Sequence, residues 1–266
     1  MLITSRANPQ IQFAKKLRSA AFRTETGLHF IEGESLVLDA INSGAEVKTV
    51  FALDEAMPRG AEAIHAEPVV TKTSTVSHGG TETISVSPIV METLCESKSA
   101  PRLCAVVKTP PTVCPDTYPD GLIIVLETVQ DPGNVGTIIR TADALGAAGV
   151  ILSPACADPF AGKTLRAAMG STYHIPLWRG DPVAEIVKLK SGGFICLCGH
   201  LQGDESLPPL GQKTALVIGN EGHGVSAELA ALCQKYRMPM RGKAESLNAA
   251  VFAGIMTDRI MHSMGR

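Results

Sequence analysis

The chain has 266 residues, of which 45% are hydrophobic and 19% charged, and a formal net charge of −2 at pH 7. This composition excludes a disordered chain, and the length suffices for one large or two ordinary domains. Apolar runs such as LIIVL and FICLCG have the length of strands, so no membrane span is predicted. The N-terminus, MLITSRANPQIQFAKKLR, lacks the continuous apolar core of a secretory signal.

The seven cysteines are scattered and form neither a CxxC pair nor the Cys/His spacing of a zinc site. Cys196 and Cys198 alternate on a predicted buried strand, where a reduced thiol behaves as a small hydrophobe. An odd, scattered set of cysteines is typical of a reducing compartment, so we expect a cytoplasmic protein without a metal.

Charge is distributed unevenly along the chain. Five basic residues precede the first acidic residue, Glu25: Arg6, Lys15, Lys16, Arg18 and Arg23. Such a segment can contact a polyanion locally although the whole chain is slightly acidic. It is equally typical of an amphipathic helix with a basic solvated face, and composition leaves both interpretations open.

A proline-rich segment divides the chain. TPPTVCPDTYPD, residues 109–120, contains four prolines, which predicts an extended linker between residues 1–108 and 121–266. The first part is predicted to hold a basic helix over about residues 8–22, a strand-to-helix turn in FIEGESLVLDAINSG, and extended pieces at VKTVFAL and RLCAVVK. The second part alternates strands (LIIVLET, GVILS, YHIPLW, FICLCG, ALVIGNEG, RMPM) with helices near residues 134–147, 161–169, 183–190, 226–234 and 246–263. This alternation predicts a parallel α/β sheet with helices on both faces, Rossmann-like from the pattern alone.

The most informative segment is ETVQDPGNVGTIIRTADALGA, residues 127–147. After an apolar strand the chain breaks at DPGN, and Asn134 is placed to cap a new helix. One stripe of that helix is apolar and should pack on the sheet: Val135, Ile138, Ile139, Ala142, Leu145 and Gly146. Arg140 lies almost opposite this stripe.

Two further segments carry polar residues between a strand and a helix. ALVIGNEGHG, residues 215–224, predicts a buried strand running into a glycine loop whose spacing fits neither GxGxxG nor a P-loop; a plain turn is the alternative. YRMPMRGKAESLNAAVFAGI, residues 236–255, predicts a short strand, a polar turn and a helix headed by Ser246 and Asn248, which are ordinary N-cap residue types.

Together, QDPGNVGTIIRTADALGA, IGNEGHGV and RMPM…SLNAAVFAGI resemble, in order, the three motifs of the SpoU/TrmH family of RNA 2'-O-ribose methyltransferases. The resemblance implies a catalytic domain over residues 121–266 with a deep trefoil knot, which no propensity argument could reach. HFIEGESLV resembles the substrate-binding domain of family members with an N-terminal extension, which implies a small L30e-like α/β domain over residues 1–108.

The resemblance also implies a set of site residues. S-adenosylmethionine would be held by Gly199, Gly219, Met238, Leu247 and Asn248, and the catalytic set would comprise Arg140, Asn134, Glu221, Ser246 and Asn248. Lys15, Lys16, Arg18, Arg23, Lys163 and Arg166 would contact RNA, although a solvated face explains Lys163 and Arg166 equally well. Because an arginine keeps its proton in proteins, Arg140 is better suited to grip a phosphate and polarise the ribose hydroxyl than to act as a base.

The last predicted helix carries an apolar stripe that one sheet edge would not cover: Val251, Phe252, Ile255, Met256 and Ile260, with Gly254 allowing close helix approach. This stripe and the family resemblance predict a homodimer with a twofold contact. The sequence departs from the family pattern at Ala250, where a serine is usual, and at Phe252, where an alanine is usual.

The expected function is methyl transfer from S-adenosylmethionine to a ribose 2'-hydroxyl of structured RNA. Ribosomal RNA is favoured over tRNA because relatives with an L30e-like extension more often act on it. A catalytically silent RNA-binding module is one alternative. A nucleotide-dependent dehydrogenase is another, but it would need a glycine fingerprint after its first strand, and DPGN does not provide one.

Overall fold

The computed structural model describes residues 2–54, 81–97 and 99–265, and these form two compact units. The first unit comprises Met1–Pro110 and Phe160–Arg166, and the second comprises Pro111–Pro159 and Ala167–Arg266. The chain passes from the first unit to the second inside the segment expected to be a linker. The assignment of Phe160–Arg166 to the first unit was not predicted, because nothing in that short stretch distinguishes it from its neighbours.

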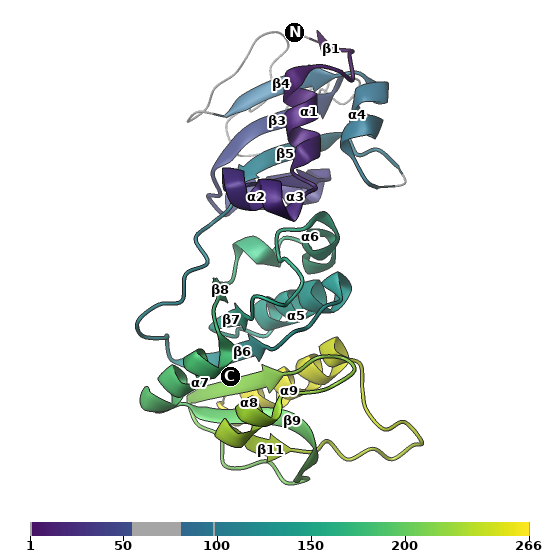
Figure 1. Ribbon diagram of the computed structural model, residues 1–266. Helices are drawn as coiled ribbons and strands as arrows, with labels where there is room; N and C mark the ends of the chain where they lie inside the picture. The colour runs from purple at the N-terminus through teal and green to yellow at the C-terminus, as the bar shows by residue number, and fades with distance from the viewer. Residues whose placement is uncertain (1, 55–80, 98, 266) are drawn as a thin grey trace. The chain divides into compact units, whose positions relative to one another are not determined.

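The first unit is built on a mixed sheet with the strand order β1-β4-β3-β5-β2 (Figure 1). Its described strands are β1 (Leu2–Ile3), β2 (Leu28–Glu32), β3 (Val47–Leu53), β4 (Glu82–Val86) and β5 (Leu103–Lys108). Its described helices are α1 (Pro9–Lys16), α2 (Ala20–Thr26), α3 (Glu34–Asn42) and α4 (Pro88–Leu94). The predicted strand-to-helix turn in FIEGESLVLDAINSG is therefore β2 followed by α3.

The basic helix expected over residues 8–22 is wrong as a single element, because α1 ends at Lys16 and α2 begins at Ala20. At the break the amides of Leu17 and Arg18 bond to carbonyls three residues earlier, which tightens the last turn. The guanidinium of Arg23 then donates to the carbonyls of Leu17 and Arg18, at 2.9 and 2.8 Å. A buried arginine thus occupies backbone acceptors that a continuous helix would have satisfied itself.

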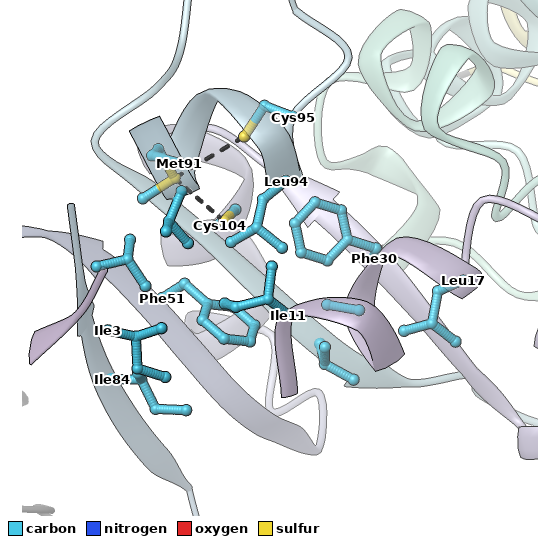
Figure 2. Packing of buried hydrophobic residues seen from close by; sticks show 14 residues of the cluster. Ile3, Ile11, Leu17, Phe30, Phe51, Ile84, Met91, Leu94, Cys95 and Cys104 are labelled. Carbon is cyan, nitrogen blue, oxygen red and sulfur yellow. Dashed lines mark hydrogen bonds between the residues drawn. The ribbon is translucent and has the colours of Figure 1, made fainter. Parts of the chain in front are cut away.

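Figure 2 shows the core of the first unit, where α1 and α4 pack against the sheet. Ile11 and Met91 are completely buried, and the Met91 sulfur lies 3.9 Å from the sulfur of Cys95 and 3.5 Å from that of Cys104. Burial raises the pKa of the Cys104 thiol, which keeps it protonated and unreactive. These sulfurs serve as compact, polarisable core atoms.

The second unit is built on a sheet with the order β11-β9-β10-β6-β7-β8, in which every recorded pairing is parallel. Its strands are β6 (Gly121–Leu126), β7 (Gly149–Leu152), β8 (Leu177–Arg179), β9 (Ile195–Asp204), β10 (Lys213–Ile218) and β11 (Gln234–Tyr236). Its helices are α5 (Pro132–Ala144), α7 (Pro182–Ser191), α8 (Ala227–Leu232) and α9 (Ala249–Ser263), with a 3-10 turn at Ser171–Tyr173. Helix α6 (Gly162–Ala168) begins in the first unit and ends in the second. The predicted parallel α/β architecture is confirmed, and the trefoil knot stays a prediction.

The two central strands of this sheet explain where a site can form. β6 and β10 pair in register from Gly121 opposite Lys213 to Leu126 opposite Ile218, and their apolar side chains are buried. Such continuous apolar runs are typical of parallel strands covered on both faces. Because the carboxyl ends of parallel strands meet at one edge, the loops after β6, β9, β10 and β11 come together there.

Two predicted elements of the third motif are displaced. RMPM, residues 237–240, is not a strand, because the pairing with β9 ends at Tyr236. The last helix begins at Ala249 rather than at residue 246. Residues 237–248 therefore form one continuous loop at the carboxyl edge of the sheet.

The predicted linker is largely attached to the second unit. The amide of Arg179 donates to the carbonyl of Thr112, and the hydroxyl of Tyr118 donates to Glu185 at 2.7 Å. Among the described residues, no helix is both long and apolar enough to cross a bilayer.

Candidate active site

Three side chains from the three motifs form one chain of hydrogen bonds. Asn248 Nδ2 donates to Asn134 Oδ1 at 2.9 Å, and Asn134 Nδ2 donates to Glu221 Oε1 at 3.0 Å. They come from the start of α9, the start of α5 and the loop after β10. The structure thus brings together three residues that lie 87 and 114 positions apart.

Asn134 was expected to cap α5, and this expectation is wrong. The N-cap is Asp131, whose Oδ1 accepts from the Asn134 amide at 2.9 Å, and Pro132 occupies the first helical turn. Proline is favoured there because its missing amide would have no helical partner. The Asn134 side chain, relieved of capping, is available for the contacts to Glu221 and Asn248.

Glu221 joins the glycine loop to the loop that precedes α5. Its carboxylate accepts from the backbone amides of Gln130 and Asp131 at 3.3 and 3.2 Å, besides the contact with Asn134. Burial raises the pKa of the Glu221 carboxyl, but the hydrogen bonds from Asn134 and from backbone amides outweigh it and hold this pKa below its ordinary value. Glu221 is therefore an anionic anchor at neutral pH.

Asn248 has two roles in the structure. Its Oδ1 accepts from the amides of Ala250 and Val251 at 2.9 and 3.2 Å, so it is the N-cap of α9, while its Nδ2 reaches Asn134. Ser246 was expected at the same helix start. It is exposed and lies two residues before the N-cap, and within the described residues its side chain makes no capping contact.

The glycine loop is closed by paired backbone bonds between Asn220 and Gly224, both 2.9 Å. A side chain at Gly219 would meet the backbone of Gly224 at 2.2 Å, so this position requires glycine. The Asn220 side chain accepts from the amides of Gly222 and His223 and donates to the carbonyl of Thr128. Sequence reasoning missed Asn220, although an asparagine before a glycine turn is a known signal for such a contact.

Arg140 is exposed on α5, on the side opposite the buried Val135, Ile138 and Ile139. α5 packs on α9, where a side chain at Gly254 would come within 3.6 Å of Thr141. Gly254 thus permits close approach of α9 to α5 within the chain.

Most of the residues expected to hold the cofactor lie at the same strand ends, and Gly199 lies inside β9, next to the last residue that pairs with β10. Gly199 is in β9, Gly219 follows β10, and Met238 and Leu247 are half-buried in the loop 237–248. Apart from the Arg237 amide, which donates to Asp204, no backbone bond of residues 237–247 to the described protein is recorded. Half-buried apolar side chains beside unpaired backbone groups suit the faces and the edge of an adenine, so the residues present fit S-adenosylmethionine.

Phe252 was expected to reshape packing or the dimer contact, and the structure places it within the chain. A side chain at Gly199 would lie 2.7 Å from two carbons of the Phe252 ring. Phe252 is half-buried, so its side chain fills space beside Gly199, which is predicted to line the cofactor site. Val251 and Ile255, by contrast, remain 50% and 36% exposed on α9.

The residues expected to contact RNA fall into two groups. Lys16 and Lys163 are exposed and Lys15 is half-buried. Arg18 donates to the carbonyl of Leu94, Arg166 lies 3.7 Å from both Glu32 and Glu96, and Arg23 is buried. The expectation for Arg23 is contradicted, because its guanidinium is turned into the protein.

Comparisons with known proteins agree with this geometry. The model of the SpoU rRNA Methylase family matches residues 121–258, and that of the MRM3-like substrate binding domain matches residues 8–105. A relative is the 23S rRNA (guanosine(2553)-2'-O)-methyltransferase RlmP of Bacillus subtilis (strain 168), 34% identical over 96% of each chain. The 23S rRNA (uridine(2479)-2'-O)-methyltransferase of Streptomyces viridochromogenes is 35% identical over 64% of this chain and 63% of its own.

A solved structure resembles the whole chain. The AdoMet bound rRNA methyltransferase from Sinorhizobium meliloti is 31% identical, with a TM-score of 0.86 over 98% of this chain and 97% of its own. The match to the family model over more than half of the chain, together with a relative aligned along nearly its full length, leads to one conclusion. The chain belongs to the SpoU rRNA methylase family.

Proposed function

We propose that this chain transfers a methyl group from S-adenosylmethionine to a ribose 2'-hydroxyl of ribosomal RNA. The observation that carries the proposal is the hydrogen-bonded line Asn248–Asn134–Glu221, which joins all three motifs at the carboxyl edge of the sheet, at the start of the helix that carries the exposed Arg140. The relatives named as 23S rRNA 2'-O-methyltransferases, and the related structure with bound AdoMet, support the reaction and the cofactor.

S-adenosylmethionine supplies an activated methyl group when bound, and the chain's own residues align and polarise the acceptor. An arginine holds its proton in proteins, so Arg140 is suited to hold an RNA phosphate and stabilise the negative charge that develops on the ribose oxygen, while the hydroxyl proton passes to water. Glu221 and Asn134 fix the loop from which α5 starts, and α5 carries Arg140. We assign cofactor binding to Gly199, Gly219, Met238 and Leu247. Asn248 is assigned a place between the cofactor and the loop from which α5 starts. Ser246 is assigned to the acceptor ribose.

We assign RNA capture to the first domain, residues 1–108, with Lys15 and Lys16 as phosphate contacts, and we assign a further phosphate contact to Lys163 of α6. Arg18 and Arg166 contact protein acceptors, so they are weaker candidates than the exposed Lys16. The two named relatives modify a guanosine and a uridine, which shows that members of this family differ in their target base. The target nucleotide is therefore chosen by RNA contacts outside the shared motifs.

The decisive experiment maps ribose methylation in cells with and without the gene, over both ribosomal RNA and tRNA. The proposal expects one ribosomal 2'-O-methyl group to disappear with the gene and to return with the wild-type chain but not with Arg140→Ala. Loss of a tRNA methyl group instead would move the substrate to tRNA. An unchanged methylation map, with RNA binding intact, would identify a catalytically silent binding module.

We further propose a homodimer in the cytoplasm. Val251 and Ile255 lie one turn apart on α9, which packs on α5, and they present an exposed apolar strip. A twofold contact would repeat this strip across the axis and cover it. Val251→Asp should give a monomer in sedimentation equilibrium, whereas a wild-type chain that sediments at 28.0 kDa would refute the dimer. All seven cysteines are free, which suits a reducing compartment.

A further inference from the structure

Thr128, the second residue after β6, has an unusual backbone conformation. Its φ is +57°, and among the described non-glycine residues positive φ is recorded for Thr128 and Met169. A β-branched residue adopts this left-handed region at a cost, because its side chain crowds the backbone. Such a conformation persists where the surroundings determine it, and it is then a pointer to function.

The contacts on either side of Thr128 hold it in place. Its amide donates to the Ser153 hydroxyl at 3.0 Å, and Ser153, at the end of β7, is 4% exposed. The next residue, Val129, is completely buried, and its carbonyl accepts from the amide of Ala157 at 2.9 Å. The chain is therefore fixed to the β7 side of the sheet both at Thr128 and immediately after it.

Asn220 fixes the same turn from the β10 side. Its Nδ2 donates to the Thr128 carbonyl at 2.9 Å, while its Oδ1 accepts from the amides of Gly222 and His223 at 2.9 and 3.1 Å. The two ends of one side chain thus have separate tasks. The oxygen shapes the glycine loop, and the nitrogen ties that loop to the turn after β6.

We propose that Thr128 and Asn220 are positioning residues for methyl transfer, an inference that rests on the function proposed above. The left-handed turn at Thr128, held by Asn220, directs the amides of Gln130 and Asp131 toward the Glu221 carboxylate, at 3.3 and 3.2 Å. Asp131 caps α5. The Thr128–Asn220 contact therefore sets where the helix with Arg140 begins, without touching the reacting atoms.

Two substitutions separate this role from a merely structural one. Asn220→Asp keeps an acceptor for Gly222 and His223 but removes the donor to Thr128, so the glycine loop keeps its turn while the tie is lost. Thr128→Gly keeps the carbonyl and adopts positive φ freely, but it also lets the turn leave the left-handed region. Met169→Gly is the matched control, because Met169 has a φ of +50° and is 58% exposed. Asn42→Asp makes the same charge change on an exposed residue of α3.

The measurements are kcat and KM for ribosomal RNA, the affinity for S-adenosylhomocysteine by isothermal titration, and the melting temperature. Asn220→Asp and Thr128→Gly should each lower kcat at least about tenfold, since small displacements of positioned groups have effects of this order or larger. Both should keep S-adenosylhomocysteine affinity within about threefold, and Thr128→Gly should melt within about 3 °C of wild type because positive φ suits glycine. The two control variants should keep the wild-type kcat.

Each outcome decides the matter. Wild-type kcat in either folded variant overturns the proposal, and so does a loss of S-adenosylhomocysteine affinity above about tenfold in Asn220→Asp, because Asn220 would then hold the cofactor. If Asn220→Asp does not fold, Thr128→Gly alone decides. A wild-type chain that methylates no ribosomal RNA would instead refute the proposed function itself, which separates the two failures.

Discussion

The two roles of Asn248 can be separated by substitution. Asn248→Ala removes the Oδ1 that accepts from the amides of Ala250 and Val251, and also the Nδ2 bond to Asn134. A lost N-cap costs about 1 kcal/mol and a lost neutral hydrogen bond about 0.5–1.5 kcal/mol. Asn248→Ala should therefore lower the free energy of unfolding by about 1.5–2.5 kcal/mol. For a domain of this size that corresponds to a fall in Tm of about 3–10 °C.

Asn248→Asp is the matched variant, because an aspartate caps a helix as well as an asparagine does but cannot donate to Asn134 Oδ1. Because the cap is kept and only the bond to Asn134 is lost, the Tm should fall by about 1–6 °C, less than in Asn248→Ala, while turnover and S-adenosylhomocysteine affinity are lost as in Asn248→Ala. Differential scanning calorimetry and isothermal titration on the same preparations supply both quantities. Wild-type cofactor affinity and turnover in Asn248→Asp would refute the argument that the link to Asn134 serves the site.

Three further predictions concern other parts of the site. Arg140→Ala should abolish methyl transfer. Because Arg140 lies off the buried face of α5, the same substitution should change the free energy of unfolding by less than about 0.5 kcal/mol. A methylation assay and urea unfolding measure the two quantities. The Glu221 pKa is lowered by folding, so its stabilising effect is complete at pH values well above the ordinary pKa of a glutamate and is lost as the pH falls through the lowered pKa. Unfolding of wild type and Glu221→Gln over this range should show their difference shrinking toward acid pH; a difference that grows would contradict the assignment. Gly199→Ala should destabilise the fold by about 1–3 kcal/mol through the contact with Phe252. In a Phe252→Ala background the same substitution should cost clearly less. Equal costs in the two backgrounds would show that the Phe252 ring moves aside without a cost in stability.

Much of the second unit followed from periodicity. The buried face of α5, with Val135, Ile138, Ile139 and Ala142, was predicted because apolar residues recur at helical spacing, and the exposed position of Arg140 follows from the same pattern. The capping of α5 was predicted wrongly although the signal was present. Asp131 and Asn134 are both good caps, but Pro132 marks the first helical turn and therefore selects Asp131.

Other features depend on tertiary contacts that no local pattern contains. Arg23 is buried because the chain breaks between α1 and α2 and leaves carbonyls for its guanidinium. Phe252 extended the apolar stripe of α9 in the sequence, yet its ring lies against Gly199 on a strand more than fifty residues earlier. The strain at Thr128 is equally invisible in sequence, since threonine is an ordinary residue after a strand and its φ is set by Ser153 and Asn220.

The hydrogen bonds of the site explain why the three motifs are informative as a set. Asp131 caps α5, and this leaves the Asn134 side chain with one acceptor for Asn248 and one donor for Glu221. Each such bond is worth about 0.5–1.5 kcal/mol, which is comparable to the cost of ordering a single loop residue. No one motif can therefore hold its own loop in place. Since both bonds meet at Asn134, a change in that side chain should be felt at Asn248 and at Glu221, whereas a change at either end should act on the other through Asn134.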